Sequence, residues 1–166
     1  MSRKKPFRVG RSLTGLGLFA TEPIKKKTLI VEYKGPRLTN DVSEKLEARG
    51  SRYLYEVNSR WTIDGSGRNN LGRYSNHSCR PNSESHQLYG KVFIRALRAI
   101  KEGEEITWNY GRDYFVNVIT PSGCKCVKCR EKRNKRRREL ALAAKRRAAR
   151  AARQKRAVRE KRAAKS

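Results

Sequence analysis

Short apolar runs separated by glycine and asparagine make up most of the first 130 residues. Five segments have the length and composition of strands, and they cover residues 16–20, 28–33, 53–57, 91–96 and 105–110. Turn residues cluster between them, mainly at 65–72. Because strands and helices do not alternate regularly, a doubly wound nucleotide-binding fold is disfavoured. The pattern predicts a mainly β domain with irregular connections.

One short helix is predicted between Asp41 and Arg49. Asp41 and Glu44 have the spacing of a capping box, and Val42 lies one turn before Leu46. Gly50 is a suitable helix stop.

The segment from residue 130 to the end has a different composition. It is an Ala/Arg/Lys tract with 18 Lys or Arg and 3 acids, a net charge of +15, and no heptad pattern. These residue types favour helix, whereas repulsion between like charges opposes it. We expect a basic tail that is disordered or helical, frayed when free and helical on a polyanion.

Charge sets the class of partner. The chain of 166 residues has a net charge of +27, and its first 129 residues already carry 24 basic and 12 acidic residues. Such a field attracts DNA, RNA, acidic proteins or anionic membranes. No apolar run approaches the roughly 20 residues of a membrane span, and no apolar stretch follows the basic N-terminus. We therefore expect neither a secretory signal nor a membrane segment.

The four cysteines are Cys79, Cys124, Cys126 and Cys129. Three of them fall within six residues, where disulfides would close short, strained loops. Metal binding in a reducing compartment is the better interpretation.

The segment from Arg73 to Asn82 is the densest in candidate chemistry. It reads Arg-Tyr-Ser-Asn-His-Ser-Cys-Arg-Pro-Asn. A single histidine in a polar loop is usually structural, but so many hydrogen-bonding groups leading into a cysteine favour a site.

This segment resembles the signature of SET-domain protein lysine methyltransferases. Three more segments resemble family motifs in the same order: Gly15-Leu16-Gly17, Tyr33-Lys34-Gly35 and the run from Glu105 to Tyr110. The resemblance covers residues 8–130. It implies a SET fold of small twisted sheets with a pseudoknot, over residues 5–113. A post-SET zinc-binding element at 114–130 and the basic tail at 131–166 would follow.

The family's activity is methyl transfer from S-adenosylmethionine to a protein lysine. The resemblance implies that seven residues contact S-adenosylmethionine: Gly15, Leu16, Gly17, Tyr53, Arg73, Asn76 and His77. It makes Tyr110 the catalytic tyrosine, with Tyr33 lining the lysine channel. The lysine must lose its proton first, and a dry channel beside a cation lowers its pKa from about 10.4.

The family's post-SET element holds zinc with three late cysteines and the one inside the Asn-His-Ser-Cys motif. This implies that Cys79, Cys124, Cys126 and Cys129 bind a structural zinc ion. The final spacing departs from the usual Cys-x-Cys-x4-Cys by two residues. Trp108 also replaces the usual Phe or Tyr that governs the number of methyl groups, and Asn109 replaces an Asp.

Lysine-rich proteins are the expected substrates: histones, histone-like nucleoid proteins or ribosomal proteins. The segment 38–60, at the place of the variable insert, is short and favours an open groove for an exposed peptide. We expect a monomer with non-specific DNA or RNA contact through the tail. We also expect an intracellular protein, in cytoplasm or nucleoid if bacterial, and in the nucleus if eukaryotic or a delivered effector.

Two other functions stay open. One is a non-catalytic, zinc-containing nucleic-acid-binding protein that retains the SET scaffold. The other is a methyltransferase acting on free lysine or a non-protein amine.

Overall fold

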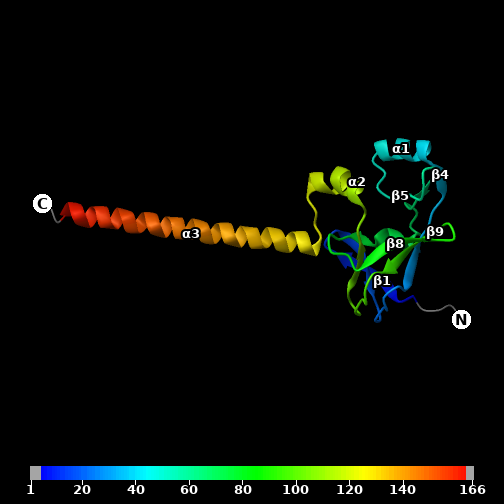
Figure 1. Ribbon diagram of the computed structural model, residues 1–166, viewed down its shortest axis with the longest axis horizontal. Coiled ribbons are helices and arrows are strands. Elements are labelled where there is room, and N and C mark those ends of the chain that lie inside the picture. The colour runs from blue at the N-terminus through cyan, green and yellow to red at the C-terminus, as the bar shows by residue number, and fades with distance from the viewer. Residues whose placement is uncertain (1–4, 164–166) are drawn as a thin grey trace. The chain divides into compact units, whose positions relative to one another are not determined.

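The computed structural model describes residues 5–163 and divides the chain into two units, Met1–Cys126 and Val127–Ser166. The first unit is rich in strands, and Figure 1 shows α1, β4 and β5 lying together at one end of it. The described part of the second unit is one helix, α3, Val127–Ala163.

The first unit contains three small sheets. One has the order β1-β2-β10-β7, built from Phe7–Ser12, Gly15–Ala20, Glu105–Trp108 and Asn76–His77. The second has the order β3-β9-β8, built from Leu29–Tyr33, Lys91–Ala96 and Ser83–Leu88. The third has the order β4-β6-β5, built from Arg37–Thr39, Trp61–Asp64 and Leu54–Glu56.

Helices connect the sheets and follow the last strand. The longest in this unit is α1, Asn40–Ala48, and η1 is a 3-10 turn at Leu71–Tyr74. After β10 come α2, Arg112–Tyr114, a π-helical turn η2, Phe115–Ile119, and a 3-10 turn η3, Thr120–Ser122.

The mainly β prediction is confirmed, and each predicted strand overlaps an observed one. Five strands were not predicted, and most of them carry too few apolar residues to mark them. Strand β8 reads Ser-Glu-Ser-His-Gln-Leu, yet it pairs along its whole length with β9. Backbone pairing with an apolar neighbour holds such a strand whatever its own composition. The strand order does not test the predicted pseudoknot, which stays a prediction.

Helix α1 forms where a helix was predicted, but the predicted capping box is wrong. The N-cap is Thr39, which makes no side-chain cap hydrogen bond. Polar contacts to β6 anchor the first turn instead, since Asn40 Oδ1 accepts a hydrogen bond from Thr62 Oγ1 at 2.9 Å. The predicted stop is confirmed, because Gly50 follows the C-cap with a φ of 90°, a conformation that favours glycine.

The tail is a continuous helix through residue 163, the helical form of the prediction. Its Ala, Arg and Lys residues all have high helix propensity. Among residues 5–163, each helix is too short or too polar to cross a membrane.

An apolar core joins the first two sheets, and the buried side-chain amide of Asn82 links their edges by hydrogen bonds. Leu18, Ile94, Ile100 and Ile106 are fully buried in this core. Asn82, 2% exposed, donates to the Glu105 carbonyl at 2.8 Å and accepts from the Thr107 amide at 2.9 Å. It therefore fixes β10 against the start of β8.

Asn82→Ala is expected to lower the free energy of unfolding by about 3 kcal/mol, since it leaves buried backbone groups unpaired. Denaturant unfolding of the whole chain measures this loss. Asn69→Ala, at an exposed turn, is the matched control and should change stability by less than about 0.5 kcal/mol. Equal losses in the two variants would contradict the role given to Asn82.

Candidate functional site

The parallel pairing of β7 with β10 brings together segments that are 31 residues apart in sequence. Thr107 lies opposite Asn76, and Trp108 lies opposite His77. The Ser78 amide donates to the Trp108 carbonyl at 2.9 Å and extends this pairing. The candidate residues of both motifs therefore meet at one edge of the first sheet.

One backbone carbonyl organises the centre of the site. The Ser75 oxygen accepts the Tyr110 hydroxyl at 2.9 Å and the Trp108 indole N–H at 3.0 Å. Ser75 is 1% exposed, so these bonds are shielded from water. A carbonyl has two lone pairs, and here both are used. The Tyr110 hydroxyl proton is thus committed to Ser75, and its oxygen lone pairs are left for another donor.

Aromatic rings surround Tyr110 and continue to Tyr33. The Tyr110 ring lies 5.0 Å from Trp108 and packs edge-on against Tyr114 at 5.2 Å. Tyr55 lies 5.9 Å from Trp108 and 5.8 Å from Tyr33, between ring centres. The candidate catalytic tyrosines therefore share one continuous aromatic wall.

Both tyrosines stay protonated at neutral pH. Burial, aided by neighbouring tyrosines, raises the pKa of Tyr110, and burial raises the pKa of Tyr33 in the same way. The Tyr33 hydroxyl donates to the Tyr53 carbonyl at 2.8 Å. Neither phenol can act as a general base near pH 7, so both serve as hydrogen-bonding groups.

Asn76 ties the glycine motif to the site. Its Nδ2 donates to the Leu16 carbonyl at 3.0 Å and to Glu105 Oε1 at 2.8 Å. A Cβ on Gly17 would lie 2.5 Å from that carboxylate oxygen, so a larger residue there would displace the Glu105 side chain from Asn76. Gly15 has a φ of 113°, again a glycine conformation.

Arg73 lines the larger of two cavities beside the site, with its guanidinium 4.0 Å from the centre of the Tyr53 ring. Its Nη1 donates to the Ser66 carbonyl. Its Nε is buried and is the one buried side-chain nitrogen or oxygen of the described residues without a hydrogen-bond partner. A buried unpaired donor is costly, so this atom is suited to an acceptor on a ligand.

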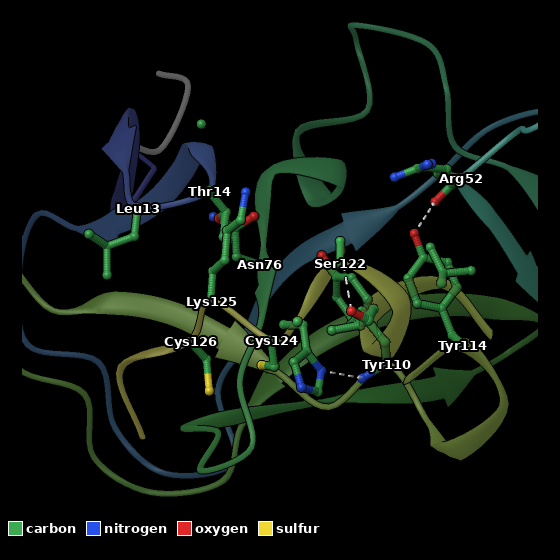
Figure 2. A pocket seen from close by; sticks show the side chains of 15 residues that line it. Leu13, Thr14, Arg52, Asn76, Tyr110, Tyr114, Ser122, Cys124, Lys125 and Cys126 are labelled. Atoms are coloured by element: carbon green, nitrogen blue, oxygen red, sulfur yellow. Dashed lines mark hydrogen bonds between the residues drawn. The ribbon is translucent and has the colours of Figure 1, made fainter. Parts of the chain in front are cut away.

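Two cavities meet at this edge. The smaller, about 520 Å³, is lined by Gly15, His77, Cys124 and Cys126 among others (Figure 2). The larger, about 1210 Å³, is lined by Leu16, Tyr33, Tyr53, Arg73 and Trp108 among others. Both are lined by the same five residues: Thr14, Arg52, Asn76, Tyr110 and Tyr114. The predicted tyrosines, Gly15 and the Asn-His pair are thus distributed over two adjoining cavities.

Three residues at this junction were not predicted. Thr14, Arg52 and Tyr114 line both cavities. Figure 2 shows Tyr114 pointing its hydroxyl toward Arg52, whose carbonyl accepts it at 3.2 Å. Tyr114 follows Tyr110 by one helical turn in sequence, but Gly111 interrupts any periodic signal that would have revealed it.

The cysteine sulfurs form a compact group. The Sγ atoms of Cys79, Cys124, Cys126 and Cys129 all lie within 4.8 Å of one another. Cys79 and Cys124 are 3.8 Å apart, the edge of a tetrahedron with metal–sulfur bonds of about 2.3 Å. Four thiolates at this spacing fit a structural zinc ion, despite the short final spacing in the sequence.

His77 links the cysteines to the tyrosine site. Its Nδ1 accepts the Tyr110 amide at 3.3 Å, so the proton of the neutral ring is on Nε2, 3.3 Å from Cys79 Sγ. Burial lowers the pKa of His77 and favours this neutral form. A ring N–H donated to a ligand sulfur orients that ligand.

Known proteins are similar to this chain in sequence. A family model described as SET domain matches residues 15–111. Histone-lysine N-methyltransferase set1 of Dictyostelium discoideum is 37% identical over 144 residues, covering 80% of this chain and 10% of that protein. The H3 lysine-4 specific histone-lysine N-methyltransferase of Candida albicans is 34% identical over 135 residues, covering 75% and 13%.

A solved structure is also similar. It is described as ctPRC2 in an autoinhibited conformation bound to S-adenosylmethionine, with a TM-score of 0.57 and 29% identity. The match covers 64% of this chain and 15% of that chain. The chain spans about a tenth of the length of the curated relatives it matches.

Proposed function

The chain belongs to the SET-domain family, and from this premise we propose that it is a protein-lysine N-methyltransferase that uses S-adenosylmethionine. One observation carries the proposal. The Tyr110 hydroxyl is fixed on the Ser75 carbonyl at the junction of two cavities, one beside the glycine motif and one beside Tyr33. Reactants held in these adjoining cavities would meet at this hydroxyl.

Seven residues are proposed to hold S-adenosylmethionine: Gly15, Leu16, Gly17, Tyr53, Arg73, Asn76 and His77. Its chemistry is an electrophilic methyl group on a sulfonium. The residues present fit this cofactor for two reasons. A side chain at position 17 would collide with its neighbours, and the buried Arg73 Nε has no hydrogen-bond partner. The smaller cavity, about 520 Å³, is also of a size that encloses small ligands, typically about 300–1000 Å³.

Tyr110 and Tyr33 are proposed to position the lysine. Because the Tyr110 proton is donated to Ser75, the hydroxyl oxygen accepts an N–H of the amine and directs the nitrogen lone pair. Desolvation in the aromatic wall favours the neutral amine. Alignment then supplies a large part of the rate, since holding reactants in line is worth about 7–11 kcal/mol in favourable cases. Trp108, 8% exposed, limits the space for added methyl groups.

We propose a histone, histone-like or ribosomal protein as substrate and the nucleus as the place of action. The names of the relatives reported above support histones as the substrate class, and these relatives are from eukaryotes. The domain boundaries 5–113, 114–130 and 131–166 are proposed as functional parts of a monomer. Nucleic acid is a second proposed partner, through the basic residues of α3.

The test is methyl transfer from labelled S-adenosylmethionine to histones, nucleoid proteins, ribosomal proteins and free lysine. Label on a protein lysine would establish the activity and its substrate class. Label on free lysine alone would favour the small-amine alternative. If no acceptor is labelled and S-adenosylmethionine does not bind, the non-catalytic nucleic-acid-binding alternative replaces the proposal.

Gly17→Ala is expected to weaken S-adenosylmethionine binding at least 10-fold, because the new Cβ displaces the Glu105 carboxylate and the Asn76 amide 3.1 Å away. The overpacking should also cost about 1–3 kcal/mol of stability. Calorimetric titration with S-adenosylmethionine measures the affinity. Gly67→Ala is the control, since its Cβ meets a movable Asn69 side chain. Unchanged affinity in Gly17→Ala would remove the glycine motif from the cofactor site.

A further inference from the structure

Helix α3 is a dense and regular array of positive charge. Its sequence holds 18 Lys or Arg and 3 Glu over 37 residues. At about 1.5 Å per residue the helix is about 55 Å long, so it carries one net charge per roughly 3.7 Å. One strand of duplex DNA carries one phosphate per about 3.4 Å. The linear charge density of the helix therefore matches that of a nucleic-acid strand.

In the part of α3 whose side chains the structure describes, no apolar face is available for another kind of partner. Leu140 and Leu142 are 60% and 51% exposed, and their two-residue spacing places them about 200° apart around the axis. A membrane-surface helix or a coiled coil needs apolar residues along one side. Binding to a polyanion requires only positively charged side chains.

The sequence of α3 also carries few side chains that stack on bases or pair with adenine. It contains no aromatic residue to stack on a base, and Asn134 and Gln154 are its only amides. Phosphate contacts position a protein on nucleic acid without sequence preference. The chemistry recognised is thus the phosphate backbone.

The charge of the chain creates a difficulty for the proposed reaction. The enzyme carries +27, and a lysine-rich substrate is also cationic. Like charges repel and slow encounter in solution. A nucleic acid that binds both proteins removes this repulsion and raises their effective concentration.

We propose that α3 binds the phosphate backbone of nucleic acid, and that nucleic acid thereby acts as a template that brings the enzyme to basic proteins bound on the same molecule. This inference rests on the proposed methyltransferase function. The nucleic acid is an activator of transfer to a basic protein, and it has no effect on transfer to a short free peptide.

Binding is tested with the full chain on a 30-base-pair duplex and on single-stranded RNA, by fluorescence anisotropy over a range of salt concentrations. If about half of the net charge of α3 reaches phosphates, the logarithm of affinity falls against the logarithm of salt with a slope of about −7 on the duplex.

Two variants remove equal charge. The helix variant carries Arg146→Gln, Arg147→Gln, Arg150→Gln and Arg153→Gln. The body variant carries Lys25→Gln, Lys26→Gln, Lys27→Gln and Lys101→Gln, all at exposed positions outside both cavities. Since about half of the helix charges are taken to reach phosphates, the helix variant is expected to make the slope shallower by about 2, and the body variant by less than about 1. Equal slopes for the helix variant and the wild type would overturn the assignment of α3.

The template effect is tested by transfer rates on a lysine-rich protein and on a short peptide around its methylated lysine. We expect DNA to raise the protein rate about 10-fold at low concentration, and excess DNA to reverse the gain by separating enzyme from substrate. The peptide rate stays constant, and the helix variant loses the gain. No gain with DNA, or an equal gain in the helix variant, would overturn the template. If neither acceptor is methylated, the proposed methyltransferase function is contradicted instead. The salt-dependence slopes would still test whether α3 binds nucleic acid.

Discussion

Tyr110→Phe is expected to lower kcat about 100-fold, the scale of losing one preorganised polar group. The hydroxyl donates to Ser75 at 2.9 Å, so the structure fixes where its oxygen lies. Its removal deletes the acceptor that would orient the lysine amine, while the ring keeps its packing against Trp108 and Tyr114. Affinity for S-adenosylmethionine should stay within about 3-fold, which separates loss of chemistry from loss of binding.

The stability of this variant should change little. Ser75 keeps the Trp108 indole as a donor, so the free energy of unfolding falls by only about 1 kcal/mol. Tyr89→Phe, at a hairpin tip and 95% exposed, is the matched control. A Tyr110→Phe enzyme with wild-type kcat would show that this hydroxyl does not touch the reaction.

The parts of the fold that the sequence predicted are those with an apolar signature of their own. Strands β3 and β9 contain runs of Ile, Val and Phe, and both lie where expected. Strands β4 and β8 are polar and exist because a neighbour pairs with them. Pairing is a long-range property, so no local pattern marks them.

The site shows the same division between local and long-range information. The motif residues Asn76, His77 and Tyr110 were identified by resemblance, and the structure brings them to one strand pair. The carbonyl that organises them belongs to Ser75, whose side chain gives no hint of it. A backbone acceptor is supplied by every residue, so its role appears only when two donors from β10 and beyond are seen to converge on it.

The wrong capping box at Asp41 has a similar cause. The spacing is correct for a cap, but β6 supplies Thr62 as a closer partner for the first turn of α1. A tertiary hydrogen bond thus replaced a local one. The basic tail illustrates the reverse case, since the local propensities of alanine, arginine and lysine favour the continuous helix α3 despite repulsion between its like charges.

Removal of zinc is expected to abolish methyl transfer while the three sheets remain folded. Residues 112–122, all of which the structure describes, contain no buried residue in α2, η2 or η3. The buried residues that follow them are Cys124 and Cys126. Apolar burial therefore contributes little to holding this segment over the smaller cavity, and metal–thiolate bonds supply the main restraint.

Purified chain should contain one zinc per molecule, and a strong chelator should lower the transfer rate more than about 100-fold. Hydrogen exchange should then rise in residues 112–126 and stay slow in β9, whose Val92 and Ile94 are fully buried. Restored zinc should restore both properties, whereas magnesium should not, because thiolates select zinc. The segment links to Tyr110 through His77 and Tyr114, so its release also loosens the catalytic tyrosine. The prediction is contradicted if the metal-free chain keeps full activity and residues 112–126 stay protected from hydrogen exchange. The four cysteines would then lie together without a role in ordering the site.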